Sequence, residues 1–123
     1  MVDFSVLKGQ IFEKVYKSGE SIIFEQNGRP KYKLYHMQDC CEDVYIEDIC
    51  GDLSNLENTE IAFAEESYHD GNSPDDFSST WSFYKLATIN GWVDIRFFGS
   101  SNGYYSERAE LEEINYYEDE DWE

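Results

Sequence analysis

Residues 80–98 read TWSFYKLATINGWVDIRFF, and this segment indicates the class of fold before any other. Two runs rich in aromatic and β-branched residues, 80–89 and 92–98, flank Asn90-Gly91. Such residues favour strands, and Asn and Gly both adopt the positive φ angles of a tight hairpin turn. The segment therefore predicts an antiparallel β-hairpin. From this hairpin and the strand after it we expect the following core side chains: Trp81, Phe83, Ile89, Val93, Ile95, Phe97 and Leu111.

A second Asn-Gly pair, Asn27-Gly28, lies between further runs of strand composition. Residues 10–17 (QIFEKVYK) and 21–26 (SIIFEQ) precede it, and residues 31–36 (KYKLYH) follow it. The last of these runs alternates cleanly, which is the period of a strand with one buried face. The beginning of the chain is therefore predicted to form a β-meander.

The middle of the chain combines short strands with turns. Val44-Tyr45-Ile46 fits either a short strand or the start of a helical turn, and residues 61–64 fit a strand. Residues 52–56 predict one helical turn, because Asp52 is a favourable N-cap residue. Residues 69–79 are rich in Gly, Asn, Ser, Pro and Asp, which is typical of a loop.

The end of the chain completes the predicted fold. Residues 99–103 (GSSNG) predict a turn, and residues 104–114 predict a third strand with Ala109 and Leu111 facing inward. We therefore predict an α+β fold that is mainly antiparallel β-sheet, a meander plus hairpins, with one or two short helices. A length of 123 residues suits one domain. We expect a single β-rich domain over residues 1–115 and an acidic, fraying tail over 116–123.

The charge of the chain is large and unevenly distributed. Nine Lys and Arg residues face 27 Asp and Glu residues, a formal net charge of −18. Residues 1–33 contain six of the basic residues and four of the acidic ones, whereas residues 34–123 contain three basic and 23 acidic residues. Such a field repels nucleic acid, which binds through Lys and Arg, and anionic membranes. It attracts basic protein surfaces.

The apolar runs and the cysteines of the chain indicate the cellular compartment to expect. No apolar run approaches the ~20 residues that span a bilayer, and the first residues lack the pattern of a signal peptide. The three cysteines, Cys40, Cys41 and Cys50, are odd in number with two adjacent, which does not fit a secreted disulfide framework. We therefore expect a cytoplasmic protein, and no membrane partner.

Three motifs carry a resemblance to a known family. They are HMQDCCEDVYIEDICGDL at 36–53, TWSFYKLATI at 80–89 and GSSNGYYSE at 99–107. They resemble a family of small bacteriophage and bacterial proteins with an H-x-x-D-C-C-E-x-V-Y-I-E-D-I core, a W-x-F-Y-K-x-A-T-I hairpin and a S-N-G-Y-Y-S-E turn. The resemblance covers most of residues 10–114 and carries no reaction. It implies a phage or mobile-element context, in which small acidic proteins often act on host machinery.

Charge and resemblance together predict a non-catalytic inhibitor without a cofactor. Its carboxylates would mask the basic, nucleic-acid-binding surface of a host defence protein, a restriction system or a CRISPR effector, as a DNA mimic does. The acidic residues expected at this interface are Glu42, Asp43, Glu47, Asp48, Glu65, Glu66, Asp75, Asp76, Glu107, Glu110, Glu112 and Glu113. The aromatic residues expected there, of the types that dominate interfaces, are Tyr104, Tyr105, Tyr116 and Tyr117.

An alternative is a small-ligand or metal-binding module, with or without catalytic activity, centred on His36, Asp39, Cys40, Cys41 and Glu42. Two observations weaken it: adjacent cysteines on a strand point to opposite faces, and nearby carboxylates raise a thiol's pKa and so disfavour the thiolate nucleophile. The many paired carboxylates are better explained as a solvated face than as a glycosidase pair. Pairing of strand edges between copies stays open, so the sequence sets no oligomeric state.

Overall fold

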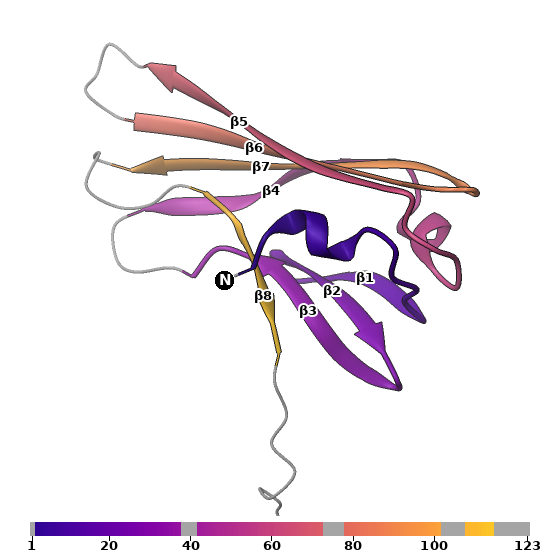
Figure 1. The fold of residues 1–123 in the computed structure, drawn as a ribbon. Helices are drawn as coiled ribbons and strands as arrows, with labels where there is room; N and C mark the ends of the chain where they lie inside the picture. The colour runs from indigo at the N-terminus through magenta and orange to yellow at the C-terminus, as the bar shows by residue number, and fades with distance from the viewer. Residues whose placement is uncertain (1, 38–41, 73–77, 102–107, 115–123) are drawn as a thin grey trace, which may run out of the picture.

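The computed structural model describes residues 2–37, 42–72, 78–101 and 108–114, which form two four-stranded antiparallel sheets. The first sheet has the strand order β1-β2-β3-β8 and the second has the order β4-β7-β6-β5. The sheets face one another, and the 3-10 helix η1 lies between them (Figure 1). The predicted mainly antiparallel fold is confirmed, and the helical content of the described residues is two short 3-10 turns. The elements, in chain order, are η1 (Phe4–Leu7), β1 (Lys14–Ser18), β2 (Ser21–Gln26), β3 (Arg29–Tyr35), β4 (Asp43–Cys50), η2 (Leu53–Leu56), β5 (Phe63–Asn72), β6 (Ser78–Thr88), β7 (Gly91–Ser101) and β8 (Glu110–Glu113).

The first sheet is the predicted meander with one strand added from the far end of the chain. Asn27 and Gly28 have φ angles of 60° and 81°, as the turn between β2 and β3 requires. β8 pairs with β3, where Leu34 lies opposite Leu111. The sequence predicts a strand that includes the residues of β8. It does not show that this strand pairs with β3 of the first sheet and not with the preceding strand, β7.

The second sheet is built around the Asn90-Gly91 hairpin. β6 and β7 pair along their whole length, from Ser78 opposite Ser101 to Thr88 opposite Gly91. The prediction of a loop over residues 69–79 is wrong at both ends, because His69 lies opposite Trp81 in a ladder that continues to Asn72. The predicted turn at 99–103 is likewise wrong in its first part, since Gly99–Ser101 belong to β7. Extended pairing with a long neighbouring strand overrides the local turn signals.

One hydrophobic core fills the space between the two sheets. Val93, Ile95, Phe97 and Leu111 are buried in it as predicted, and so is Ala109. Trp81, Phe83 and Ile89 are not. On β6 the inward positions belong to Ser82, Tyr84 and Leu86, so Phe83 faces out and is 37% exposed. Ile89 is in the turn and 88% exposed.

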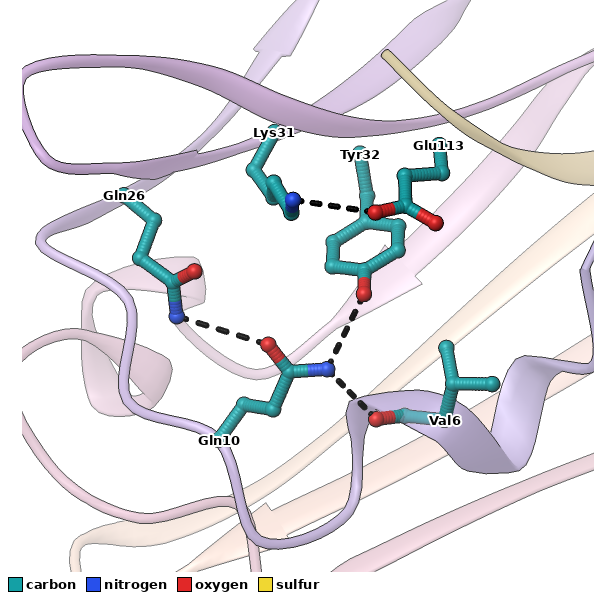
Figure 2. Close-up of polar contacts among 6 residues, drawn as sticks. All are labelled: Val6, Gln10, Gln26, Lys31, Tyr32 and Glu113. Atoms are coloured by element: carbon teal, nitrogen blue, oxygen red, sulfur yellow. Dashed lines mark hydrogen bonds and ion pairs between the residues drawn. The ribbon is translucent and has the colours of Figure 1, made fainter. Parts of the chain in front are cut away.

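The segment before β1 is held to the first sheet by a glutamine. The Gln10 side-chain amide donates to the Val6 carbonyl at 2.6 Å and contacts the Tyr32 hydroxyl at 3.1 Å, and its oxygen accepts from Gln26 at 3.4 Å (Figure 2). These contacts join η1 to β2 and β3. In η2, Asp52 caps the turn as predicted by accepting from the Ser54 amide at 3.0 Å. Neither helical turn of the described residues has the length to span a membrane.

Candidate functional site

The candidate site is the outward face of the β4-β7-β6-β5 sheet, which we call the outer face. At one end of this face a row of aromatic rings crosses all four strands. Tyr45, Phe98, Trp81 and His69 occupy matched register positions on β4, β7, β6 and β5. Successive ring centroids are 5.8, 5.0 and 6.0 Å apart, which is the range of favourable aromatic contacts.

Gly71 on the edge strand β5 makes room for the largest of these rings. A Cβ atom at this position would lie 2.7 Å from the Trp81 ring and 2.8 Å from the Ser79 hydroxyl. The indole therefore lies close over the backbone of β5, and the row of rings reaches the edge of the sheet.

A second aromatic group lies at the opposite end of the outer face. Phe63 of β5 and Trp92 of β7 have ring centroids 5.2 Å apart. Trp92 is 56% exposed, which is a large fraction because tryptophan side chains are mostly buried in folded proteins. The Lys85 ammonium is 5.8 Å from the Trp92 ring centroid, so the face of this indole already accepts a cation.

A charged belt separates the two aromatic groups. Arg96 contacts Glu47 at 2.7 Å and Asp48 at 3.8 Å, and Lys85 lies 3.8 Å from Asp94. The belt contains a shallow hollow of about 320 Å³. Its outward-facing lining residues are Asp48, Cys50, Glu65, Ser67, Phe83, Lys85, Asp94 and Arg96.

The two sheets carry opposite charge. The first sheet, with β8 included, contains five basic and four acidic residues, whereas β4 to β7 contain two basic and seven acidic residues. The two basic residues, Lys85 and Arg96, are both paired with carboxylates of their own sheet. The excess negative charge of the strands therefore lies on the second sheet.

Two of the three carboxylates predicted on β8, Glu112 and Glu113, have partners in the first sheet. Glu112 accepts from the Tyr35 hydroxyl at 2.6 Å, and this hydrogen bond raises the pKa of Tyr35 to about 12. Glu113 pairs with Lys31 at 2.9 Å (Figure 2). These two residues bind within the domain, so we do not place them at the centre of the site.

A second hollow, of about 370 Å³, lies where β5 approaches β8. It brings together Asp3, Glu66, Tyr68 and Glu110, which are far apart in sequence. The Arg108 guanidinium stacks over the Tyr68 ring at 4.2 Å. Within the part of the chain that the structure describes, no three His, Cys, Asp or Glu side chains are grouped closely enough to hold a metal ion.

Glu42 was predicted to be an exposed residue of the acidic interface, and this prediction is wrong. Its side chain is fully buried and contacts His36 Nε2 at 2.7 Å, while His36 Nδ1 lies 2.9 Å from the Arg108 carbonyl. His36 therefore joins the ends of three segments: it follows β3, Glu42 precedes β4, and Arg108 precedes β8. This pair is part of the packing between the sheets.

The alternative centre around His36 is only partly described. His36 and Glu42 do meet, but Asp39, Cys40 and Cys41 lie outside the described residues. Cys50 is exposed, and its thiol donates to Asp48 at 3.4 Å, which raises the pKa of the thiol and disfavours the thiolate.

The other predicted contact residues divide into two groups. Asp43, Glu47 and Asp48 on β4 and Glu65 and Glu66 on β5 are exposed, as the prediction requires. The following lie outside the described residues: Asp75, Asp76, Tyr104, Tyr105, Glu107, Tyr116 and Tyr117.

Sequence reasoning missed the aromatic residues of the outer face. The available signal was the presence of large apolar residues at both odd and even positions of β6 and β7, which places such residues on both faces of the sheet. Side chains alternate between the two faces along β7. If Val93, Ile95 and Phe97 point into the core, then Trp92, Arg96 and Phe98 must point outward.

Comparison with known proteins gives a family but no function. A family model described as Domain of unknown function (DUF7448) matches residues 5–111. No curated protein and no solved structure matches the chain significantly.

Proposed function

Because the chain belongs to the DUF7448 family, whose description names no activity, we propose from its geometry a non-catalytic acidic binding protein. Its target is the basic, nucleic-acid-binding surface of another protein, which it masks. In the phage context that the sequence motifs imply, this target is a host restriction or CRISPR protein, and the domain is its inhibitor.

One observation carries the proposal: the negative charge is concentrated on the exposed side of one sheet. All seven acidic residues of β4 to β7 are exposed. Five of them, Asp43, Glu47, Asp48, Glu65 and Asp94, lie on the outer face, whereas Glu66 and Asp70 lie opposite the inward-facing Tyr84 and Thr80. The two basic residues of the same strands are paired within the sheet and cancel only part of this charge. A basic surface that approaches this sheet meets a net negative potential, which speeds association and favours the complex at low salt.

The spacing of these carboxylates supports masking of a DNA site. Glu47 and Asp48 lie on one edge strand and Glu65 lies on the other. Three strand spacings of about 4.8 Å place the two edges about 14 Å apart. The major groove of B-DNA, bounded by two phosphate rows, is about 12 Å wide. Two acidic edges at this separation suit a protein surface that grips duplex DNA across a groove.

The test is a competition experiment with purified host restriction and CRISPR effector proteins and a fluorescent DNA duplex. The domain is expected to displace the duplex, and less so as salt rises toward ~0.5 M. One variant removes four outer-face charges, and we expect each exposed charge to contribute about 0.5 kcal/mol. The substitutions are Asp43→Asn, Glu47→Gln, Asp48→Asn and Glu65→Gln.

The matched control removes four charges from elsewhere in the described structure. Its substitutions are Asp3→Asn, Glu13→Gln, Glu25→Gln and Glu60→Gln. Both variants have the same net charge, so a general effect of charge lowers their activity equally. The outer-face variant is expected to compete about thirtyfold less well than the control, as about 2 kcal/mol implies. Equal competition by both variants, or none by the unaltered domain, would contradict the proposal.

A further inference from the structure

The outer face has the composition of a surface that another molecule covers. Seven rings point outward from its four strands, two of them tryptophans: Tyr45, Phe63, His69, Trp81, Phe83, Trp92 and Phe98. The opposite face of the same sheet packs on the core through Tyr84, Leu86 and their neighbours. Exposed aromatic groups gathered on one face of a sheet mark interaction sites.

The size of the outer face suits a protein partner. Eleven-residue strands such as β6 and β7 extend about 36 Å, and four strands are about 19 Å wide. The face therefore covers roughly 700 Å², close to the ~800 Å² that each partner contributes to a standard interface. The hollow of about 320 Å³ between the aromatic groups gives the face a concave centre.

The charge of the belt indicates what kind of segment binds. Carboxylates of Asp48, Glu65 and Asp94 line the hollow and outnumber its two cations, and Glu47 pairs with Arg96 beside it. A second copy that packed through its own outer face would bring like charges together across the interface, which opposes self-association of this kind. Single-stranded nucleic acid can stack on aromatic rings, but its phosphates would meet the same carboxylates.

The rings favour arginine over lysine in that segment. A guanidinium is planar, stacks on aromatic faces and binds carboxylates through two parallel hydrogen bonds, whereas an ammonium is a compact, strongly hydrated charge. The chain itself contains such a contact, because the Arg108 guanidinium lies 4.2 Å from the Tyr68 ring centroid. On the outer face, Trp92 and Phe83 border the carboxylates and are exposed enough to be stacked in the same way.

We propose that the outer face docks an arginine-bearing segment of a protein partner, with guanidinium groups stacked on Trp92 and Phe83 and paired with the belt carboxylates. This inference rests on the proposed function and names the partner chemistry that the acidic sheet selects. Carboxylates supply the long-range attraction, and the rings supply the preference for arginine.

The test uses two fluorescein-labelled nine-residue peptides and the whole domain at low salt. In one peptide arginine alternates with valine, and in the other lysine replaces every arginine. Fluorescence anisotropy is expected to show about fivefold tighter binding of the arginine peptide. Trp92→Thr and Phe83→Thr are each expected to weaken the arginine peptide by about five- to thirtyfold and the lysine peptide by less than about twofold. Threonine keeps the preference for a strand.

The matched control is Ile11→Thr, because Ile11 is 54% exposed and Trp92 is 56% exposed, yet Ile11 is not on the outer face. Circular dichroism checks that each variant is folded. The control is expected to bind both peptides as the unaltered domain does.

The outcomes separate this inference from the proposed function. Suppose that both peptides bind with equal affinity, that the Trp92 and Phe83 variants bind them unchanged, and that the four-charge variant loses binding. This result overturns the inference and leaves the proposed function standing. Failure to bind either peptide at low salt counts against both. Binding of a labelled oligothymidylate through Trp92, or a salt-insensitive dimer that Trp92→Thr dissociates in sedimentation, also overturns the inference.

Discussion

The buried pair between His36 and Glu42 provides the sharpest test of how the two sheets are held together. The relative exposures of these side chains are 5% and 0%, and the two atoms are 2.7 Å apart. The Arg108 carbonyl can only accept, so His36 Nδ1 donates to it, and one proton lies between Nε2 and the Glu42 carboxylate. Replacing Glu42 by alanine removes the partner of a buried ring nitrogen.

The size of the effect follows from this burial. Removing one partner of a buried ion pair costs about 3–5 kcal/mol. The contact of His36 Nδ1 with the Arg108 carbonyl does not involve Glu42, so we expect a loss at the low end, about 3 kcal/mol. For a domain of this size that corresponds to a fall in Tm of about 12 °C. Glu42→Gln keeps an acceptor near Nε2 and should lose about 1 kcal/mol.

The assay is urea denaturation followed by circular dichroism, with Glu113→Ala as the control. Glu113 forms a pair of similar length, 2.9 Å to Lys31, but both side chains are about one-third exposed, at 35% and 36%. Exposed pairs contribute less than about 1 kcal/mol. If Glu42→Ala and Glu113→Ala lower the free energy of unfolding equally, burial does not govern the stability of the His36 contact and the reasoning fails.

Three further predictions test other contacts. Tyr84→Phe removes a buried hydrogen bond of 2.9 Å to the backbone ahead of β8, so the free energy of unfolding should fall by about 1–3 kcal/mol in the same urea assay; no change would show that this bond is dispensable. Gly71→Ala should displace the Trp81 ring, giving shifted tryptophan fluorescence and a loss of about 1–3 kcal/mol, and an unaltered spectrum would contradict the close packing. The folded-state pKa of Tyr35, about 12, is raised above the unfolded value, so its contribution to stability is present below about pH 10 and lost as the pH rises toward 12. Glu112→Gln should return this pKa toward the usual value in an ultraviolet titration of tyrosinate; a pKa that stays near 12 would rule out Glu112 as the cause.

Local signals predicted the hairpins of this fold well. Asn27-Gly28 and Asn90-Gly91 both form the predicted turns, and Asp52 caps its helical turn. Positive φ occurs at both Asn27 and Gly28, but only at Gly91 in the second hairpin. The position of β8 beside β3 was not predictable in this way, because pairing between residues some 80 positions apart leaves no mark in local composition. The buried contact of His36 with Glu42 was hidden for the same reason.

The charge of the candidate site was only partly predictable. Counting residues shows that the acidic excess begins after Lys33, and the structure places seven of these acidic residues on the second sheet and three on β8 of the first. Counting cannot show that Glu112 and Glu113 are engaged by Tyr35 and Lys31 while Glu65 remains available. The sequence therefore predicts that the surface is negatively charged. The contacts made within the folded sheets decide which carboxylates remain available to a partner.

Which side chains of β6 point into the core, and which point outward, bears on both the main error in the predicted core and the proposed function. Hydrophobicity alone favours Trp81 and Phe83 as the buried residues of this strand, yet the core takes Ser82 and Tyr84. Tyr84 fits because its ring packs on Phe4 and Phe97 while its hydroxyl reaches the Ala109 carbonyl. A strand that turns its most apolar rings toward solvent gives up burial worth about 2 kcal/mol for each ring. In a chain with so much negative charge, a partner that covers those rings and neutralises the carboxylates beside them recovers this energy on binding.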